Sequence, residues 1–566
     1  MVSRTVSTKV RTGASASTCC PFFSGRTIPS WLAARYRRES GVAVCYFGDG
    51  AASKGDFHES LNFAGIHRLP VVFICENNGY AISVPLAKES AVENIAQHAH
   101  SYGFPGVIVD GNDPLDVYAA VHGALRHARR DEGPSLVECK TYRYLAHTSD
   151  DDDRTYRTPE EVEAWRKKDP LQRMKQYLIE QRLLPEAREE QLEAEVAAEV
   201  DDAVRRAEEA GEPDPDAAFS RVYARPLAPG RAAPRPGEGG TVRSIIDTVR
   251  QTQRDLMAAD ERVLVLGEDV GPRGGVFRAT DGLHAEFGDR RVIDTPLAES
   301  SIVGIAIGLA LADLRPIAEI QFDDFIHSAF DQIVSEAAKI HYRSNGDFRV
   351  PLVIRAPWGG GVHGALYHSQ CIEAFYAHVA GLKVVVPSTP ADVAGLLREA
   401  VEDPDPVLFL EHKKTYRLIK GAVPDGEWRV PIGVADVART GDDLTIVTYG
   451  LHRHLSLEAA DALAEEGHSI EVVDLRTIAP LDRDTVLRSA AKTGRVLVVH
   501  EDNVSFGVGA EVAALVAGEA FYDLDAPVRR LAMPDVPAMP FAAPMERAVS
   551  IGADEIAAAA RALLEV

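Results

Sequence analysis

The segment VAVCYFGDG, residues 42–50, is a short apolar run that ends in Gly-Asp-Gly, and VVFICENNG, residues 71–79, is a second run of the same kind. Both runs predict buried parallel strands. Between them, residues 57–69 carry apolar side chains at helical spacing, which predicts a strand, helix, strand unit. The two strand ends should therefore lie side by side at one edge of a sheet, with Asp49 next to Asn78.

The same alternation of strands and helices continues through the first unit, residues 41–222. Further apolar runs at 106–109 and 136–139 extend its sheet, and a charged helical stretch follows them. Proline and glycine then accumulate in residues 223–240, and turn-forming residues accumulate again in residues 421–441. Such composition is typical of linkers, so the chain is expected to divide at these two places.

Two more α/β units follow, at residues 241–420 and 442–566. Their apolar runs predict strands at 263–266, 317–321, 352–355 and 384–386 in the second unit, and at 445–448, 469–473 and 495–499 in the third. Strands that alternate with helices predict parallel sheets covered by helices on their faces. The fold class is therefore α/β, with three domains.

Bulk properties exclude several function classes. The chain has 566 residues, 46% hydrophobic and 26% charged, which is typical of packed globular domains. Its formal net charge of -24 disfavours nucleic acid as a partner. The longest apolar stretch, residues 302–312, is shorter than the ~20 residues that a membrane-spanning helix needs. Six cysteines without C-x-x-C spacing predict neither a zinc site nor a disulfide framework, so a reducing compartment fits.

Residues 1–40 form a leader that lies outside the three predicted domains. Residues 1–38 contain no Asp or Glu but seven Lys or Arg residues among many Ser and Thr. That composition resembles a mitochondrial transit peptide and would place the protein in the mitochondrial matrix. The Ala-, Arg- and Gly-rich composition elsewhere favours instead a leader on a bacterial, cytoplasmic protein.

The two strand ends place a carboxylate and a carboxamide together. Hard oxygen donors of this kind suit Mg²⁺, which binds through few protein ligands plus phosphates. Glycines beside the carboxylate allow a diphosphate to approach, and the following helix offers its amides. Gly-Asp-Gly or Asn-Asn-Gly alone is more often an ordinary turn or loop. The pair at this spacing resembles the thiamine-diphosphate (ThDP) binding families. The resemblance implies Mg²⁺ ligation by Asp49, Asn78 and the Tyr80 carbonyl, and cofactor contacts from Gly48, Asp49, Gly50 and Ala51.

The stretch YRYLAHTSDDDDRTYR, residues 142–157, resembles the active-site loop of the α subunit of branched-chain 2-oxo acid dehydrogenases. A run of four aspartates alone would indicate only a solvated acidic loop. The resemblance implies that His147 lies beside the cofactor phosphates and serves the acyl-transfer step. It also implies that four side chains hold the loop together, namely Arg143, Asp151, Tyr156 and Arg157.

DTPLAE, residues 294–299, precedes the apolar helix at 302–312. By itself, Glu299 is a favourable charge at a helix start. The surrounding sequence is similar to β subunits of the same family, and the resemblance implies that Glu299 hydrogen-bonds the aminopyrimidine ring of the cofactor. Positions near the same pocket are Gln321, Phe325 and His368, the last within HGALYHSQ at residues 363–370. The preceding GGGVHG formally matches a dinucleotide-binding pattern, but no acidic residue follows at the distance that pattern needs.

The resemblance spans residues 41–223 and 241–566. It implies two ThDP-binding domains plus a transketolase C-terminal-like domain, with α and β subunits fused and the front of the α part missing. The implied reaction is oxidative decarboxylation of a branched-chain 2-oxo acid on ThDP and Mg²⁺, with acyl transfer to a lipoyl-bearing dihydrolipoyl transacylase. A homodimer of the fused chain is expected. The alternatives are a pyruvate-specific enzyme, a transketolase-type enzyme, and an inactive relic.

Overall fold

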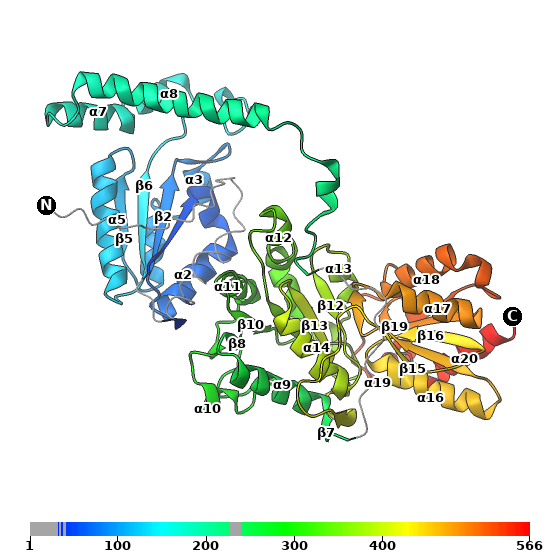
Figure 1. The fold of residues 1–566 in the computed structure, drawn as a ribbon. Helices are drawn as coiled ribbons and strands as arrows, with labels where there is room; N and C mark the ends of the chain where they lie inside the picture. The colour runs from blue at the N-terminus through cyan, green and yellow to red at the C-terminus, as the bar shows by residue number, and fades with distance from the viewer. Residues whose placement is uncertain (1–31, 33–35, 38–40, 226–238) are drawn as a thin grey trace.

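The computed structural model describes residues 32, 36–37, 41–225 and 239–566. The leader at 1–40 and the linker at 223–240 therefore lie largely outside the described residues. Figure 1 shows three α/β units in chain order, with the long helix α8 running beyond the first. No helix in the described ranges is long and apolar enough to cross a bilayer.

The first unit is built on a four-stranded parallel sheet in the order β1-β2-β6-β5. Helix α2 packs its Phe57 and Leu61 against one face, whereas α5 packs against the other, as a doubly wound sheet requires. Its elements are β1 (Ala43–Gly48), η2 (Asp49–Ser53), α2 (Gly55–Ile66), β2 (Val71–Asn77), β3 (Tyr80–Ala81), β4 (Val84–Pro85), α3 (Leu86–Glu89), η3 (Ile95–Gln97), α4 (His98–Ser101), β5 (Gly106–Asp110), α5 (Pro114–Arg129), β6 (Ser135–Lys140), η4 (Asp153–Thr155), α6 (Pro159–Arg166), α7 (Pro170–Glu180), α8 (Glu186–Glu209) and η5 (Pro215–Phe219).

The second unit has a seven-stranded sheet in the order β18-β12-β13-β11-β10-β8-β9, parallel except for β18. Strand β18 is contributed by the third unit. The elements of the second unit are β7 (Thr241–Ser244), α9 (Ile245–Ala259), β8 (Val263–Gly267), α10 (Leu283–Phe287), β9 (Val292–Asp294), α11 (Glu299–Leu311), β10 (Arg315–Glu319), η6 (Asp323–Ala329), η7 (Gln332–Ala337), α12 (Ile340–Arg343), β11 (Val353–Trp358), η8 (Ala365–Tyr367), α13 (Glu373–Ala377), β12 (Lys383–Val385), α14 (Pro390–Glu402), β13 (Val407–His412), α15 (Thr415–Leu418) and β14 (Lys420–Val423).

The third unit has a five-stranded sheet in the order β15-β17-β16-β19-β20, parallel except for β15. Helices cover it on both faces (Figure 1). Its elements are β15 (Asp436–Arg439), β16 (Leu444–Thr448), α16 (Leu451–Glu465), β17 (Ile470–Asp474), β18 (Thr477–Ala479), α17 (Arg483–Thr493), β19 (Val496–Asn503), α18 (Val508–Glu519), η9 (Phe521–Asp523), β20 (Arg529–Met533), α19 (Ala543–Val549) and α20 (Ala553–Leu564).

The α/β class and the neighbouring parallel strands after which Asp49 and Asn78 stand are confirmed. Described parts of both predicted linkers, residues 223–240 and 421–441, pair with other segments of the chain. Strand β14 pairs antiparallel with β7, and β15 joins the third sheet, so both ends of residues 421–441 are strands. Likewise, Asp405 accepts hydrogen bonds from the backbone N–H groups of Ala224 and Arg225 at 2.7 and 3.2 Å, which ties the start of the predicted linker to the second unit. These pairings depend on segments far apart in sequence.

Candidate active site

Asp49 and Asn78 meet at the carboxyl edge of the first sheet. The backbone N–H of Asn78 donates to Asp49 Oδ1 at 3.2 Å, and Asn78 Oδ1 accepts from the backbone N–H of Tyr80 at 3.1 Å. Asp49 is 1% exposed, and its Oδ2 has no hydrogen-bond partner among the described residues. Burial raises the pKa of Asp49, and the N–H of Asn78 offsets part of that rise. An ionised, unpartnered oxygen in such a place is costly unless a cation compensates it.

The small residues around Asp49 leave room beside this carboxylate. Gly48 has no atom within 4 Å of the position that a Cβ would occupy, whereas a Cβ on Gly50 would meet the Cβ of Ala81 at 2.8 Å. Ala51 is half-buried in η2, the turn that leads into α2. The open space at Gly48 and the free Asp49 oxygen fit a metal-bound diphosphate, because both the charge and the room that it needs are present.

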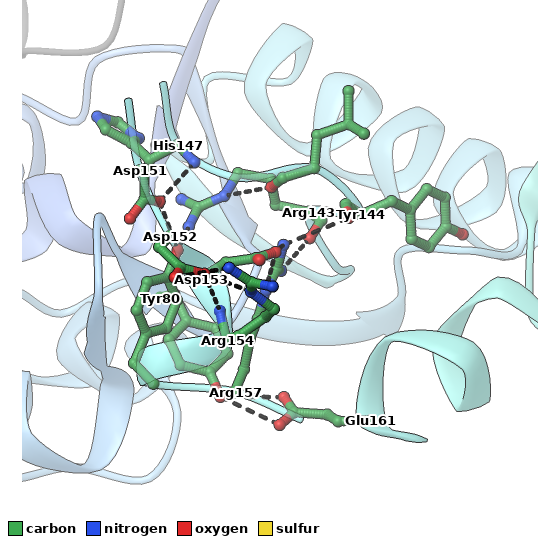
Figure 2. A network of polar contacts seen from close by, with 12 residues as sticks. Tyr80, Arg143, Tyr144, His147, Asp151, Asp152, Asp153, Arg154, Arg157 and Glu161 are labelled. Carbon is green, nitrogen blue, oxygen red and sulfur yellow. Dashed lines mark hydrogen bonds and ion pairs between the residues drawn. The ribbon is translucent and has the colours of Figure 1, made fainter. Parts of the chain in front are cut away.

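The loop after β6 is closed by a network around Asp151, which Figure 2 shows. Asp151 Oδ2 accepts from the Tyr156 hydroxyl at 2.7 Å and from the backbone N–H of His147 at 2.8 Å. Arg143 donates to the Tyr156 hydroxyl at 3.2 Å and to the carbonyl of Ile82 at 2.6 Å. The two bonds to Asp151 fix the backbone at His147. The bond from Arg143 to Ile82 ties the loop to the segment after Tyr80.

A second cation, Arg157, closes the base of the same loop. It is 4% exposed, and its guanidinium donates to Asp153 at 2.6 Å and to the carbonyls of Arg143 and Tyr144. Glu161 accepts from the hydroxyl of Tyr80 at 3.0 Å, as Figure 2 shows, and from that of Tyr142 at 3.0 Å, and it joins the loop to the Asp49 edge. All first-unit residues predicted for the site therefore belong to one connected group.

Glu299 begins α11 and is 8% exposed. Beside it lies Glu268, which directly follows β8 and was not predicted. Burial and the neighbouring charges of Glu299 and Asp269 raise the pKa of Glu268 to about 7. Gln321, which follows β10, donates to Asp269 at 3.4 Å. Glu268 could have been predicted by the same signal as Gln321. Both directly follow a central parallel strand, and ligands bind at the carboxyl ends of such strands.

His368 lies against two aromatic rings. The ring centroids of His368 and Phe322 are 4.5 Å apart at 89°, and those of His368 and Phe325 are 5.5 Å apart at 79°. Phe322 was not predicted, although it directly follows Gln321. Glu299, Gln321, Phe325 and His368 thus surround the carboxyl ends of β8 and β10 and form a second group.

The first and second units pack through α2 and α11, which lie side by side in Figure 1. Glu59 on α2 accepts hydrogen bonds from the hydroxyls of Ser300 and Ser301 on α11, and Lys54 lies 3.6 Å from Asp331. Within the described part of the chain, no hydrogen bond or ion pair joins the group of Asp49 and His147 to that of Glu299 and His368. One chain therefore holds both groups without connecting them directly.

Comparison with known proteins decides the family. The model described as "Dehydrogenase E1 component" matches residues 13–216, "Transketolase, pyrimidine binding domain" matches 243–419 and "Transketolase, C-terminal domain" matches 433–556. The 2-oxoisovalerate dehydrogenase subunit beta of Bacillus subtilis is 56% identical over 325 residues, which are 57% of this chain and 99% of that protein. The chain belongs to the E1 family of 2-oxo acid dehydrogenases. An α-like domain and a β-like part are fused in this E1 chain.

Other relatives of this E1 chain differ in the substrate that their names state. The Pyruvate dehydrogenase E1 component subunit beta of B. subtilis is 50% identical, covering 52% of this chain and 90% of that protein. The 3-methyl-2-oxobutanoate dehydrogenase subunit beta of Mycobacterium tuberculosis is also 50% identical, covering 52% and 85%. A solved structure titled "Split gene transketolase, inactive beta4 tetramer" is 25% identical with a TM-score of 0.48, covering 58% of this chain and 99% of that one. The two ThDP-binding domains imply ThDP as the cofactor.

Proposed function

We propose that this E1 chain decarboxylates a branched-chain 2-oxo acid with ThDP and Mg²⁺ and passes the acyl group to a lipoyl-bearing dihydrolipoyl transacylase. The observation that carries the proposal is the His147 loop, closed by Asp151, Tyr156 and Arg143 onto the Asp49 edge. The substrate choice is supported by 56% identity to a 2-oxoisovalerate dehydrogenase β subunit against 50% to a pyruvate dehydrogenase β subunit. The bacterial relatives favour the cytoplasm as its location.

In this proposal the first group holds the charged end of the cofactor. Asp49 and Asn78 would bind Mg²⁺ through side chains and Tyr80 through its carbonyl, while Gly48 and Gly50 let the diphosphate approach. The free Oδ2 of Asp49 supports this assignment. When bound, ThDP supplies the carbon nucleophile and the electron sink for loss of CO₂.

The second group would hold the opposite end of the cofactor and the substrate. Glu299 would hydrogen-bond the aminopyrimidine ring, and Gln321 and Phe325 would line the same space. His147 and His368 would move protons at the substrate, because an imidazole can both donate and accept a proton. The aromatic walls beside His368 would limit the access of water to that space.

We infer that the working form is a homodimer. No hydrogen bond or ion pair joins the two groups within the described chain, which supports an arrangement in which the Asp49 group of one chain meets the Glu299 group of a second copy. Mixing a D49N chain with a Glu299→Gln chain tests this inference. In a dimer with shared sites, the mixture regains activity that neither variant has alone. No recovery after co-refolding would contradict it.

The substrate proposal is tested by decarboxylation of 2-oxoisovalerate and pyruvate by the purified full chain with ThDP and Mg²⁺. We expect the higher kcat/KM for 2-oxoisovalerate, and a higher value for pyruvate would replace our choice by the pyruvate-specific alternative. The inactive-relic alternative is tested by calorimetric titration with ThDP and Mg²⁺. Absence of a binding signal would favour that alternative over ours.

A further inference from the structure

The segment that carries His368, residues 359–370, leaves strand β11 of the second unit and runs against the C-terminal unit. At its start, the backbone N–H of Gly360 donates to Glu501 Oε1, and Glu501 Oε2 lies 2.6 Å from Nε2 of the buried His412. Burial alone would raise the pKa of Glu501, but the charge and hydrogen bond of His412 reverse this and lower it to about 2. The beginning of the segment is therefore held by an ionised group of the third unit.

A second contact lies in the middle of the segment. His363 Nδ1 is 2.6 Å from Oε2 of Glu546, which belongs to α19 of the C-terminal unit. The Glu546 side chain is 8% exposed, whereas that of His363 is 59% exposed. His363 has a φ of 56°, in the left-handed region, so this turn needs outside contacts to persist.

The turn at His363 directly supports His368. A Cβ on Gly364 would lie 2.7 Å from both the Cβ and the carbonyl oxygen of His368, so only a glycine lets the turn approach His368 this closely. On its other side, the His368 ring contacts Phe322 and Phe325. His368 thus packs its ring against two aromatic rings of the second unit, and its Cβ and carbonyl oxygen face a turn that Glu546 contacts.

We propose that Glu546 is a positioning residue, which fixes His368 in the active site through His363 and Gly364. The inference rests on the proposed function, in which His368 faces the substrate. It gives the C-terminal unit a part in the reaction, although that unit supplies none of the other proposed site residues. Loss of the contact would let the turn relax and shift His368, and small displacements of a reacting group reduce rates steeply.

The kinetic test compares Glu546→Gln with wild type. We expect kcat to fall about tenfold with KM changed less than about twofold, because the loss concerns the positioning of a reacting group rather than substrate binding. His363→Asn breaks the same contact from the exposed side, and asparagine tolerates the positive φ at this position. It should also lower kcat with little change in KM. The matched control is Glu466→Gln, which removes the ion pair with Arg561 in the same unit and should leave kcat unchanged.

The double variant of Glu546→Gln with His368→Ala decides whether the effect passes through His368. We expect no further loss of kcat beyond that of His368→Ala alone. A multiplicative loss would overturn the proposal, and so would an unchanged kcat in both Glu546→Gln and His363→Asn.

Hydrogen exchange of the chain without cofactor gives a readout that does not need activity. Peptides covering residues 361–368 should exchange faster in Glu546→Gln and in His363→Asn than in wild type or Glu466→Gln. Equal exchange in all four proteins would overturn the proposal. An inactive wild type would contradict the proposed function instead, and the exchange result would still decide whether Glu546 holds the turn.

Discussion

Oδ1 of Asp49 accepts a hydrogen bond from the backbone N–H of Asn78 at 3.2 Å, across the carboxyl ends of two neighbouring parallel strands. The bond orients the Asp49 carboxylate and leaves Oδ2 buried and without a hydrogen-bond partner in the described structure. The orientation comes from the backbone of β1 and β2. A substitution at Asp49 therefore tests the charge separately from the fold.

Asp49→Asn should abolish measurable ThDP binding in the presence of Mg²⁺, because the carboxamide keeps the contact with Asn78 but removes the negative charge. We expect affinity to fall at least about 100-fold, because even the loss of a residue that only supports a metal ligand costs about 10- to 100-fold. Calorimetric titration measures it. The control, Asp110→Asn, removes a carboxylate at the end of β5 that pairs with Arg173 at 2.7 Å, and it should bind as wild type does. Retained binding by Asp49→Asn would exclude Asp49 as a metal ligand.

Asp151→Ala should loosen the His147 loop. The Tyr156 hydroxyl and the His147 N–H hold the pKa of Asp151 below its ordinary value, so the carboxylate is ionised where it closes the loop. Its removal should speed hydrogen exchange in residues 143–157 and lower turnover without changing the thermal unfolding of the second unit. Asp152→Ala, which breaks the exposed pair with Arg154 and the cap bond from the Arg154 backbone N–H but none of the bonds to Asp151, serves as control. Similar exchange in both variants would show that Asp151 does not order the loop.

Arg355→Met should destabilise the second unit by about 3–5 kcal/mol, the usual cost of removing one member of a buried ion pair. Arg355 is fully buried and donates to Glu319 at 2.7 Å and to Glu411 at 2.6 Å, so its loss leaves two carboxylates without a compensating charge. Urea unfolding followed by circular dichroism measures the change. Arg262→Met, which removes a half-exposed pair with Asp260, should cost about 1 kcal/mol or less. A comparable loss in both variants would contradict this ranking.

Glu268→Gln should change how stability depends on pH. Because the folded-state pKa of Glu268 is about 7 and its ordinary value is 4.5, the folded chain holds this proton more tightly than the unfolded chain. The stabilisation is complete below pH 4.5 and is lost as pH rises to about 7. Relative to wild type, the variant should therefore gain roughly 2–4 °C in Tm between pH 5 and pH 8, the shift that about 1 kcal/mol produces in a domain of this size. A pH-independent difference in Tm would argue against the raised pKa.

The sequence alone determined the features that depend on neighbouring residues. Apolar runs followed by Gly-Asp-Gly and Asn-Asn-Gly specified two strands, and the single helix between them made those strands parallel neighbours. The spacing of the two runs was therefore enough to place Asp49 beside Asn78. The apolar stretch at 302–312 likewise predicted the helix that Glu299 begins.

Only the tertiary structure decided the contacts between distant segments. The pairing of β14 with β7 and the place of Glu268 beside Glu299 depend on which elements become neighbours in the sheets. The contact of His363 with Glu546 joins residues of different units, and no local periodicity encodes it. The physical reason is that spacing along the chain fixes strand and helix faces, whereas side-chain pairs across units form only when whole domains pack.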